Sequence, residues 1–112
     1  MALFTWSALA GGFLSGRLMR QNARQHEAQM YHRCYACEVN FKRLDRAQEL
    51  ARAKRVTVPQ LALAWVLHHP LELYPLVAAY HPREFEQLTK ALEIELTQTE
   101  SEWLDLERDV RE

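Results

Sequence analysis

Two short apolar runs, at residues 2–6 and 74–79, are the strand-like segments of this sequence, and helical patterns fill most of the rest of the chain. Short apolar runs beside glycine or proline favour buried strands over helices. Because helices separate the two strands, they should pair in parallel. A two-stranded parallel sheet is too small to be covered and stable alone. We therefore expect an α/β chain in the order strand, loop, helix, helix, strand, helix, helix.

All three glycines of the chain lie in residues 7–16 (SALAGGFLSG), directly after the first predicted strand. We call this segment the glycine loop. Glycine carries no Cβ, so its backbone can approach a ligand closely. The glycine loop is therefore the best candidate for a binding site. The alternative interpretation is a simple turn, with Trp6 as an ordinary core aromatic.

The longest helical pattern begins at Asn40, whose side chain can cap the first turn, and should end near Lys54. Residues 57–60 (TVPQ) then match a capping box with a proline in the first turn. They predict a helix over residues 58–69, ended by Pro70. The apolar residues expected on these helices are Phe41, Leu44, Ala47, Leu50, Ala51, Leu61, Ala62 and Trp65.

Residues 18–33 show no periodicity and predict a loop or irregular segment. After the second strand, a helix should begin at Pro82, and a second capping box at residues 97–100 (TQTE) opens the last helix. The apolar residues expected on these two helices are Phe85, Leu88, Leu92, Trp103, Leu104, Leu106 and Val110.

The length of 112 residues indicates one domain, or a piece of a larger one. Fourteen basic and fifteen acidic residues give a formal net charge of −1, which argues against nucleic acid or an anionic membrane as the partner. The longest apolar runs fall far short of the roughly 18 residues that suggest a membrane span. The expected compartment is the cytoplasm.

The two cysteines, Cys34 and Cys37, form a single CYAC motif with His32 nearby. A structural zinc site needs four ligands, so His32 and one more side chain would have to complete it. A redox CxxC motif normally opens a helix after a strand, whereas the residues before Cys34 are polar and unpatterned. Chance pairing in a surface loop is therefore favoured, and no metal site is predicted. A small metal or redox protein is the alternative.

Three segments, SALAGGFLSGR, NFKRLDRAQELARAKRVTVPQLALAWVLHHP and PLVAAYHPREFEQLTKALEIELTQTESEWLDL, together resemble the C-terminal third of the aldo-keto reductases. The most specific part is VTVPQLALAWVLHHP. The resemblance implies a C-terminal fragment of a (β/α)8 TIM barrel, with two short parallel strands and about four helices. Residues 1–112 would then be a partial domain, from strand seven to the C-terminal helix.

Members of this family transfer a hydride between a nicotinamide cofactor, usually NADPH, and a carbonyl or alcohol substrate. Their catalytic Asp, Tyr, Lys and His belong to earlier strands, so the resemblance implies no catalytic residue in this chain. The chain would be inactive alone and would need a missing N-terminal barrel chain. The alternative is a non-catalytic remnant that self-associates or binds another protein.

By the same resemblance, the chain holds part of a cofactor cradle. Trp6 stands at the end of strand seven, where the family usually stacks an aromatic side chain on the nicotinamide ring. Residues 7–9 match the loop along the pyrophosphate, where backbone amides and a hydroxyl can bind phosphate oxygens. Gln87 matches a position that often contacts adenine. The predicted cofactor contacts are Trp6, Ser7, Ala8, Leu9, Gly12 and Gln87.

The sequence departs from the family pattern after strand eight. The family usually has cations and amides there that bind the 2′-phosphate and adenine. Glu84 occupies one such position and would repel a phosphate at close range, while Arg83 is one residue out of register. The resemblance therefore implies NADP(H) as cofactor, but without the basic residues that usually hold its 2′-phosphate. The residues at the departing positions are Ala78, Ala79, Tyr80, Glu84 and Leu88.

Overall fold

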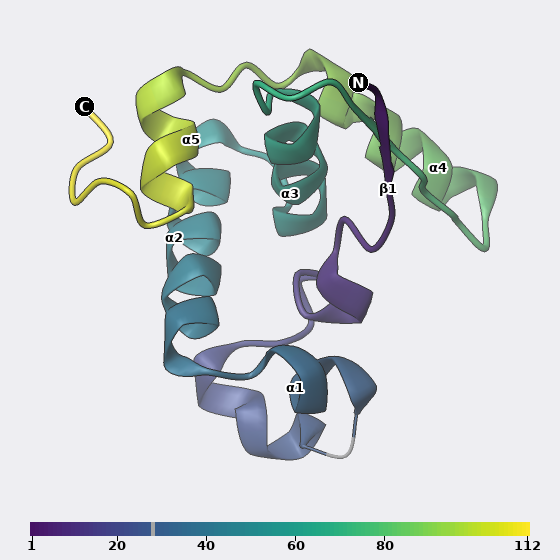
Figure 1. Cartoon of the computed structure of the whole chain (residues 1–112). Helices are drawn as coiled ribbons and strands as arrows, with labels where there is room; N and C mark the ends of the chain where they lie inside the picture. Colours follow the sequence, from purple (N-terminus) through teal and green to yellow (C-terminus); the bar gives the residue numbers. More distant parts are fainter. Residues whose placement is uncertain (28) are drawn as a thin grey trace.

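The computed structural model describes residues 1–27 and 29–112. In this part of the chain there are two strands, five α-helices and three 3-10 helices (Figure 1). The elements, in chain order, are β1 (Leu3–Thr5), η1 (Ala10–Gly12), η2 (Arg20–His26), α1 (Met30–Tyr35), α2 (Glu38–Lys54), α3 (Val58–Leu67), β2 (Leu73–Pro75), α4 (Pro82–Thr89), η3 (Lys90–Glu93) and α5 (Gln98–Leu104).

β1 and β2 pair in parallel, which confirms the predicted α/β arrangement and agrees with a segment of a (β/α)8 barrel. Both strands are shorter than predicted. The backbone turns into the left-handed region at Ser7, with φ 57°, and the hydrogen bond from Leu76 N to Thr5 O ends the ladder. The prediction of a strand over residues 76–79 is wrong because β1 does not extend beside them. The paired residues are Leu3 with Leu73, Phe4 with Tyr74 and Thr5 with Pro75.

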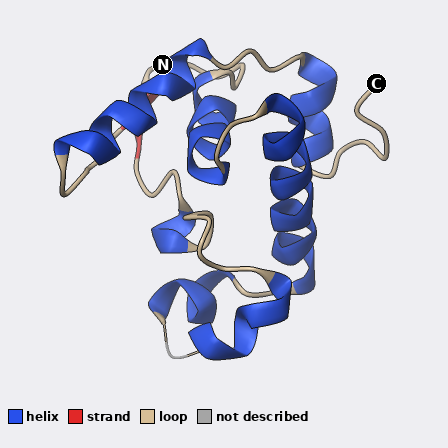
Figure 2. Ribbon diagram, turned by 180° about the vertical axis from the view of Figure 1, so that it is seen from behind, coloured by secondary structure: helices blue, strands red, loops and turns tan. Residues whose placement is uncertain are grey.

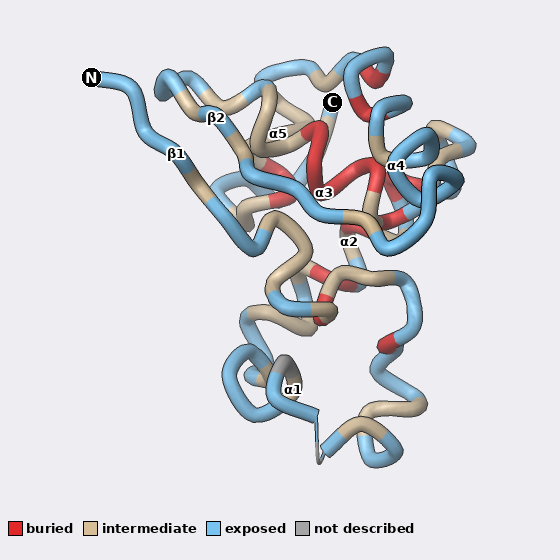
Figure 3. The backbone as a smooth tube through the Cα atoms, turned by 90° about the vertical axis from the view of Figure 1, so that its right-hand side faces the viewer, coloured by how far each residue is buried: buried red, intermediate tan, exposed pale blue. Residues whose placement is uncertain are grey.

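The strands are not buried, contrary to the prediction. Phe4 is 74% exposed, and its ring lies against that of Tyr74 with 5.7 Å between the centroids. Thr5 and Leu73 point to the other face and line a cavity beside α3. Figure 3 shows β1 as mostly exposed and β2 as a mixture of intermediate and exposed residues, with no buried residue in either strand. Helices therefore cover one face of this sheet and leave open the face that carries Phe4 and Tyr74.

The main core lies where α2, α3 and α5 meet (Figure 3). Leu44 of α2 and Leu61 of α3 are almost completely buried there, as the helical periodicity predicted. A second, smaller cluster joins α3 to η3 through Leu63, Ala64, Ala91 and Ile94. Figure 2 shows that helices account for nearly all regular structure, so helix packing rather than the sheet holds this chain together.

The prediction of an irregular segment over residues 18–33 is wrong, because η2 and most of α1 lie within it. These helices lie together near the N-terminal end of α2 (Figure 1). Interactions between residues distant in sequence hold them: Leu18 is fully buried, and the Arg20 guanidinium pairs with Glu38 at 3.0 Å and with Asp45 at 2.8 Å. Such interactions leave no periodic signal in the segment itself.

The start of α2 also differs from the prediction. Cys37 is its N-cap residue and Glu38 its first helical residue, so Asn40 lies inside the first turn. The Asn40 amide nitrogen donates to the Tyr35 carbonyl at 2.8 Å. Asn40 therefore ties α1 to α2 rather than capping the helix. The predicted end near Lys54 is confirmed.

Both predicted capping boxes are confirmed. Thr57 Oγ1 accepts from Gln60 N at 3.3 Å while Gln60 Oε1 accepts from Thr57 N at 3.0 Å, and Thr97 and Glu100 make the same reciprocal pair. α3 ends at Leu67, two residues earlier than predicted: Pro70 disfavours helical backbone at His69, and His68 is the C-cap with φ −93° and ψ 2°.

The last helices deviate from the predicted apolar faces at three places, and the first is Phe85 of α4, which was predicted on an apolar face but is 54% exposed. η3 replaces the last turn of the helix predicted from Pro82, and the tighter 3-10 winding rotates Leu92 outward, where it is 71% exposed. Ala91 and Ile94 are buried instead. α5 ends at Leu104, and Leu106, predicted within the helix, has a left-handed φ of 66°. Val110, also predicted on this helix, lies exposed beyond its end.

Among the described residues, none of the helices combines the length and the apolar composition needed to cross a bilayer.

The capping box of α3 gives a stability prediction. Replacing Thr57 with alanine removes the oxygen that accepts from Gln60 N, and we expect the free energy of unfolding to fall by about 1 kcal/mol. Chemical denaturation followed by circular dichroism measures this change. Thr57→Ser keeps the hydroxyl and should stay close to wild type. Equal losses in both variants would show that the methyl group, not the cap, matters.

Candidate functional site

The glycine loop leaves β1 through backbone that ordinary side chains rarely adopt. Ser7 and Ala10 have φ of 57° and 52°, and Gly11 and Gly12 have φ of 64° and 117°. Glycine accepts this region without strain, whereas Ser7 and Ala10 carry a conformational cost. Hydrogen bonds from Ala10 N to Ser7 O at 2.8 Å and from Leu14 N to Leu9 O at 2.9 Å hold the turn. The loop is thus a fixed, tightly wound turn at the carboxyl end of β1.

A cavity of about 280 Å³ lies between the glycine loop and the segment that follows β2. It sits beyond the carboxyl ends of both parallel strands, which is where α/β sheets and barrels bind ligands. Four of the predicted contacts, Ser7, Ala8, Leu9 and Gly12, line it together. The side opposite them is formed by Leu76, Val77 and Ala78, with Leu63 and Leu88 at the helices.

Leu76 and Val77 were not expected at this cavity, because the apolar run 74–79 had placed them in the interior of a strand, whereas Ala78 is one of the departing positions that the resemblance places near the cofactor. The length of the first apolar run could have indicated Leu76 and Val77. A strand of five residues, 2–6, can pair with only about five residues of its partner, so the end of the six-residue run 74–79 should extend beyond the sheet. The ends of two parallel strands lie side by side, so the residues after each strand converge.

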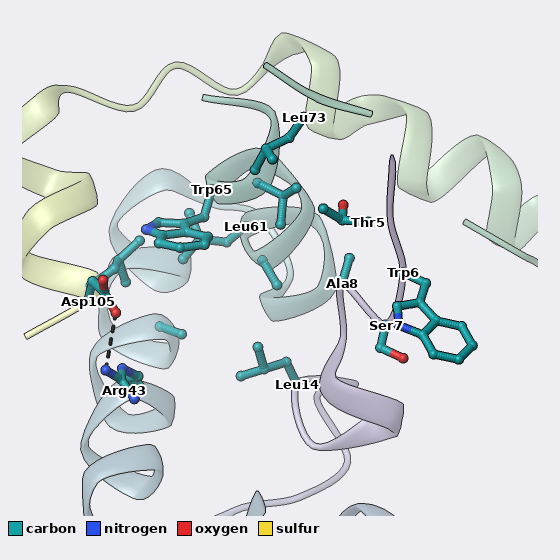
Figure 4. Close-up of a pocket in the computed structure, with 14 residues that line it drawn as sticks. Thr5, Trp6, Ser7, Ala8, Leu14, Arg43, Leu61, Trp65, Leu73 and Asp105 are labelled. Carbon is teal, nitrogen blue, oxygen red and sulfur yellow. Dashed lines mark ion pairs between the residues drawn. The ribbon is translucent and has the colours of Figure 1, made fainter. Parts of the chain in front are cut away.

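A second cavity of about 370 Å³ lies on the α3 side of the glycine loop (Figure 4). Its walls are apolar, with Leu61, Trp65 and Leu73 prominent, and the ion pair of Arg43 with Asp105 at 3.2 Å stands at one edge. Trp65 Nε1 donates to the Ser101 carbonyl at 3.2 Å, which fixes this indole in the wall. The cavity offers an apolar surface and few polar groups.

Trp6 borders this second cavity but does not fill it. Its indole is 82% exposed and projects to the side of β1 opposite Leu61 and Trp65 (Figure 4). Phe4 and Tyr74 also lie exposed on the open face of the sheet. We call these three residues, Phe4, Trp6 and Tyr74, the aromatic face. The Tyr74 hydroxyl donates to Glu72 Oε1 at 2.7 Å, and this bond, with a smaller effect of burial, raises the pKa of Tyr74.

Gln87 is not brought together with the other predicted contacts. The Gln60 amide nitrogen donates to the Gln87 carbonyl at 2.9 Å and to Gln87 Oε1 at 3.1 Å, and Gln60 is only 5% exposed. Both glutamines line a separate polar cavity that also includes Lys54 and Lys90. Gln87 therefore links α3 to α4, and its predicted role at adenine remains a prediction.

The departing positions after β2 have roles of their own. Glu84 Oε2 accepts from the Tyr80 amide at 2.9 Å, so this carboxylate lies at the first turn of α4. The Tyr80 side chain is exposed, and Leu88 packs against the cluster of α3 and η3. The first turn of α4 thus carries a carboxylate where an anionic ligand would need a donor.

Cys34 and Cys37 are both free and exposed. The His32 ring lies near Phe41, with 6.5 Å between centroids. Within residues 1–27 and 29–112, no three side chains of His, Cys, Asp or Glu gather as a metal site would require. The described structure therefore provides no ligand set for the metal-protein alternative.

Parts of known proteins are similar in sequence to this chain. A model of the Aldo/keto reductase family matches residues 1–106. The chain is 33% identical over 99 residues to "Uncharacterized oxidoreductase YrpG" of Bacillus subtilis (strain 168), covering 86% of this chain and 28% of that protein. It is 29% identical over 110 residues to "Versiconal hemiacetal acetate reductase" of Aspergillus parasiticus, covering 94% of this chain and 32% of that protein. The chain thus spans about a third of the length of these relatives.

Proposed function

Because this chain belongs to the aldo/keto reductase family, we propose that it supplies the cofactor-facing part of an oxidoreductase and works with the rest of a barrel. The observation that carries the proposal is the cavity at the carboxyl ends of β1 and β2, lined by Ser7, Ala8, Leu9 and Gly12. The reaction is hydride transfer between a nicotinamide cofactor and a carbonyl or alcohol. Proton transfer and substrate binding fall to residues outside this chain.

The residues at the glycine loop suit the nicotinamide and pyrophosphate portion of such a cofactor. The exposed Trp6 indole offers a large flat face beside the loop, which can hold an aromatic ring in one orientation. The positive φ angles at Gly11 and Gly12 expose backbone without a Cβ next to the cavity. The cofactor, when bound, supplies the hydride, and these residues bind and orient it.

The residues after β2 do not suit a 2′-phosphate. Glu84 places its carboxylate against the Tyr80 amide, and a second anion there would meet repulsion. Tyr80 and Leu88 offer no positive charge at the other departing positions. We therefore infer that the preference for NADPH over NADH is weakened in this protein.

The partner that we propose is a chain or segment that carries the remaining barrel strands. The aromatic face is exposed although helices cover the opposite side of the sheet, and exposed apolar surfaces favour association. The backbone N–H of Leu3 and the backbone carbonyl of Thr5 form hydrogen bonds to residues at the two ends of β2. The backbone groups of Phe4 therefore point to the opposite edge of β1, where a further strand could pair. We place the assembly in the cytoplasm, whose reducing conditions suit the exposed free thiols.

A non-catalytic remnant that self-associates is the second candidate, and the same aromatic face favours it. Sedimentation and nucleotide binding together distinguish the two. A stable homodimer that binds no nucleotide would support the remnant, whereas nucleotide binding at Trp6 supports the cofactor role.

We predict that the oxidised nucleotide NAD+ quenches the fluorescence of Trp6; NADH is unsuitable because it absorbs where tryptophan emits and would quench all three indoles by energy transfer. A bound nicotinamide against the indole should lower the emission of the wild-type chain on titration, and Trp6→Phe should abolish the saturable part of the change. Trp65→Phe is the matched control, because Trp65 lies in the apolar cavity wall and donates to Ser101. NADP+ should bind no more tightly than NAD+. Saturable quenching that persists in Trp6→Phe would contradict the cofactor assignment.

A further inference from the structure

We propose that Cys34 and Cys37 form a redox-active dithiol, which a peroxide converts reversibly into an intrachain disulfide. The proposal is independent of the cofactor role, since it concerns the turn that joins α1 to α2. These are the two cysteines of the chain, and both are exposed. Cysteine is among the residue types most often buried, and because both of these thiols are exposed, an oxidant in solution can reach them.

We infer from the backbone of the turn that the two cysteines can reach each other. Cys34 and Tyr35 lie in the last turn of α1, Ala36 is extended with φ −73° and ψ 100°, and Cys37 is extended with φ −148°. A helical residue followed by an extended one is the conformation of a type VIII β-turn, in which the first and fourth Cα atoms lie within about 7 Å. A disulfide requires a Cα separation of about 4.4–6.8 Å.

Hydrogen bonds hold this turn in place before any oxidation. Ala36 N donates to the His32 carbonyl at 2.9 Å, and Phe41 N donates to the Cys37 carbonyl at 2.9 Å. The Asn40 side chain adds a bond across the turn to the Tyr35 carbonyl at 2.8 Å. Because the turn is already fixed by both helices, closing the disulfide requires little further ordering of the backbone.

The reaction balances with a hydroperoxide as the oxidant. One thiolate attacks a peroxide oxygen and breaks the O–O bond, giving a sulfenic acid and, after proton transfer, water or an alcohol. The second sulfur then attacks the sulfenic sulfur, forms the S–S bond and releases the hydroxyl group as water. The two sulfurs lose two electrons in total, and the peroxide takes up both.

The disulfide would fix the end of α1 against the start of α2, close to the glycine loop. Tyr35 lies between the two cysteines, and its ring is 6.3 Å from that of Phe13, a buried residue of the glycine loop. The Phe41 ring of α2 lies 5.5 Å from the same Phe13 ring. The aromatic cluster of Tyr35, Phe41 and Phe13 thus connects the dithiol to the glycine loop.

The sequence itself allows a direct test, because Arg33 and Lys42 bracket both cysteines in a single tryptic peptide, CYACEVNFK. The full chain is treated with hydrogen peroxide at low protein concentration, its remaining thiols are alkylated, and it is then digested. We expect this peptide to lose the mass of two hydrogen atoms and to escape alkylation. Dithiothreitol should restore two alkylatable thiols, and the extent of oxidation should not depend on protein concentration.

Cys34→Ser and Cys37→Ser are the matched controls, since each leaves one thiol in the same turn. After peroxide treatment, both variants should give a sulfenic acid or a disulfide between two chains. In neither variant should the tryptic peptide lose the mass of two hydrogen atoms. A wild-type chain that yields only interchain disulfides, or sulfinic and sulfonic acids at both positions, would overturn the proposal. Full alkylation of both thiols after peroxide treatment would overturn it as well.

Discussion

Replacing Trp103 with alanine is expected to lower the free energy of unfolding by about 3–5 kcal/mol, the cost of removing a large aromatic side chain from a core. Trp103 is 6% exposed and belongs to the main cluster with Leu44 and Leu61. The guanidinium groups of Arg46 and Arg111 lie 5.0 and 5.3 Å from its ring centroid, and such interactions add to the stabilisation. The substitution also loosens the C-terminal tail, because Arg111 loses the ring against which it lies.

Urea denaturation of the purified chain measures this effect. Trp6→Ala is the matched control, since it removes the same side chain from a position that is 82% exposed, and its loss should stay within about 0.5 kcal/mol. The ratio between the two losses matters more than either value. Similar losses in both variants would show that the core is not centred on α2, α3 and α5.

The helix starts that the sequence predicts correctly are those that depend on neighbouring residues. Each capping box needs only two side chains three positions apart, as in Thr57 with Gln60, and both formed as predicted. The predicted start of α2 was wrong because Asn40, a good cap by type, instead bonds to the Tyr35 carbonyl across the turn from α1. The hydrogen-bond partner of Asn40 lies outside the helix, so the periodicity of the helix could not predict where α2 begins.

The helices between residues 18 and 35 could not be predicted because their stabilising interactions come from far along the chain. Leu18 is buried in the main cluster, and Arg20 pairs with Asp45, twenty-five residues later. Leu92 was assigned to a buried face because the predicted helix continued at 100° per residue, whereas η3 winds more tightly and buries Ala91.

The candidate site was predictable on one side only. The composition of the glycine loop and its position after a strand indicated a site within residues 7–16, and the resemblance to the aldo-keto reductases then singled out Ser7, Ala8, Leu9 and Gly12, which line the cavity. On the other side, the presence of Leu76 and Val77 depends on where β2 ends, and that end is set by the turn of the backbone at Ser7 rather than by the apolar run itself. Gln87 was placed by resemblance alone, and its pairing with Gln60 follows from the packing of α4 on α3.

The packing of α2 gives the second large effect. Leu44→Ala should lower the free energy of unfolding by about 2–5 kcal/mol, because the side chain is fully buried and its removal leaves a cavity among rigid helices. Val39→Ala, on the same helix at a position 49% exposed, should cost far less and controls for the change in helix propensity. Denaturation of both variants under one set of conditions measures the difference. If Leu44→Ala costs no more than Val39→Ala, then α2 does not pack through this face, and the core formed with α3 and α5 would have to be rejected.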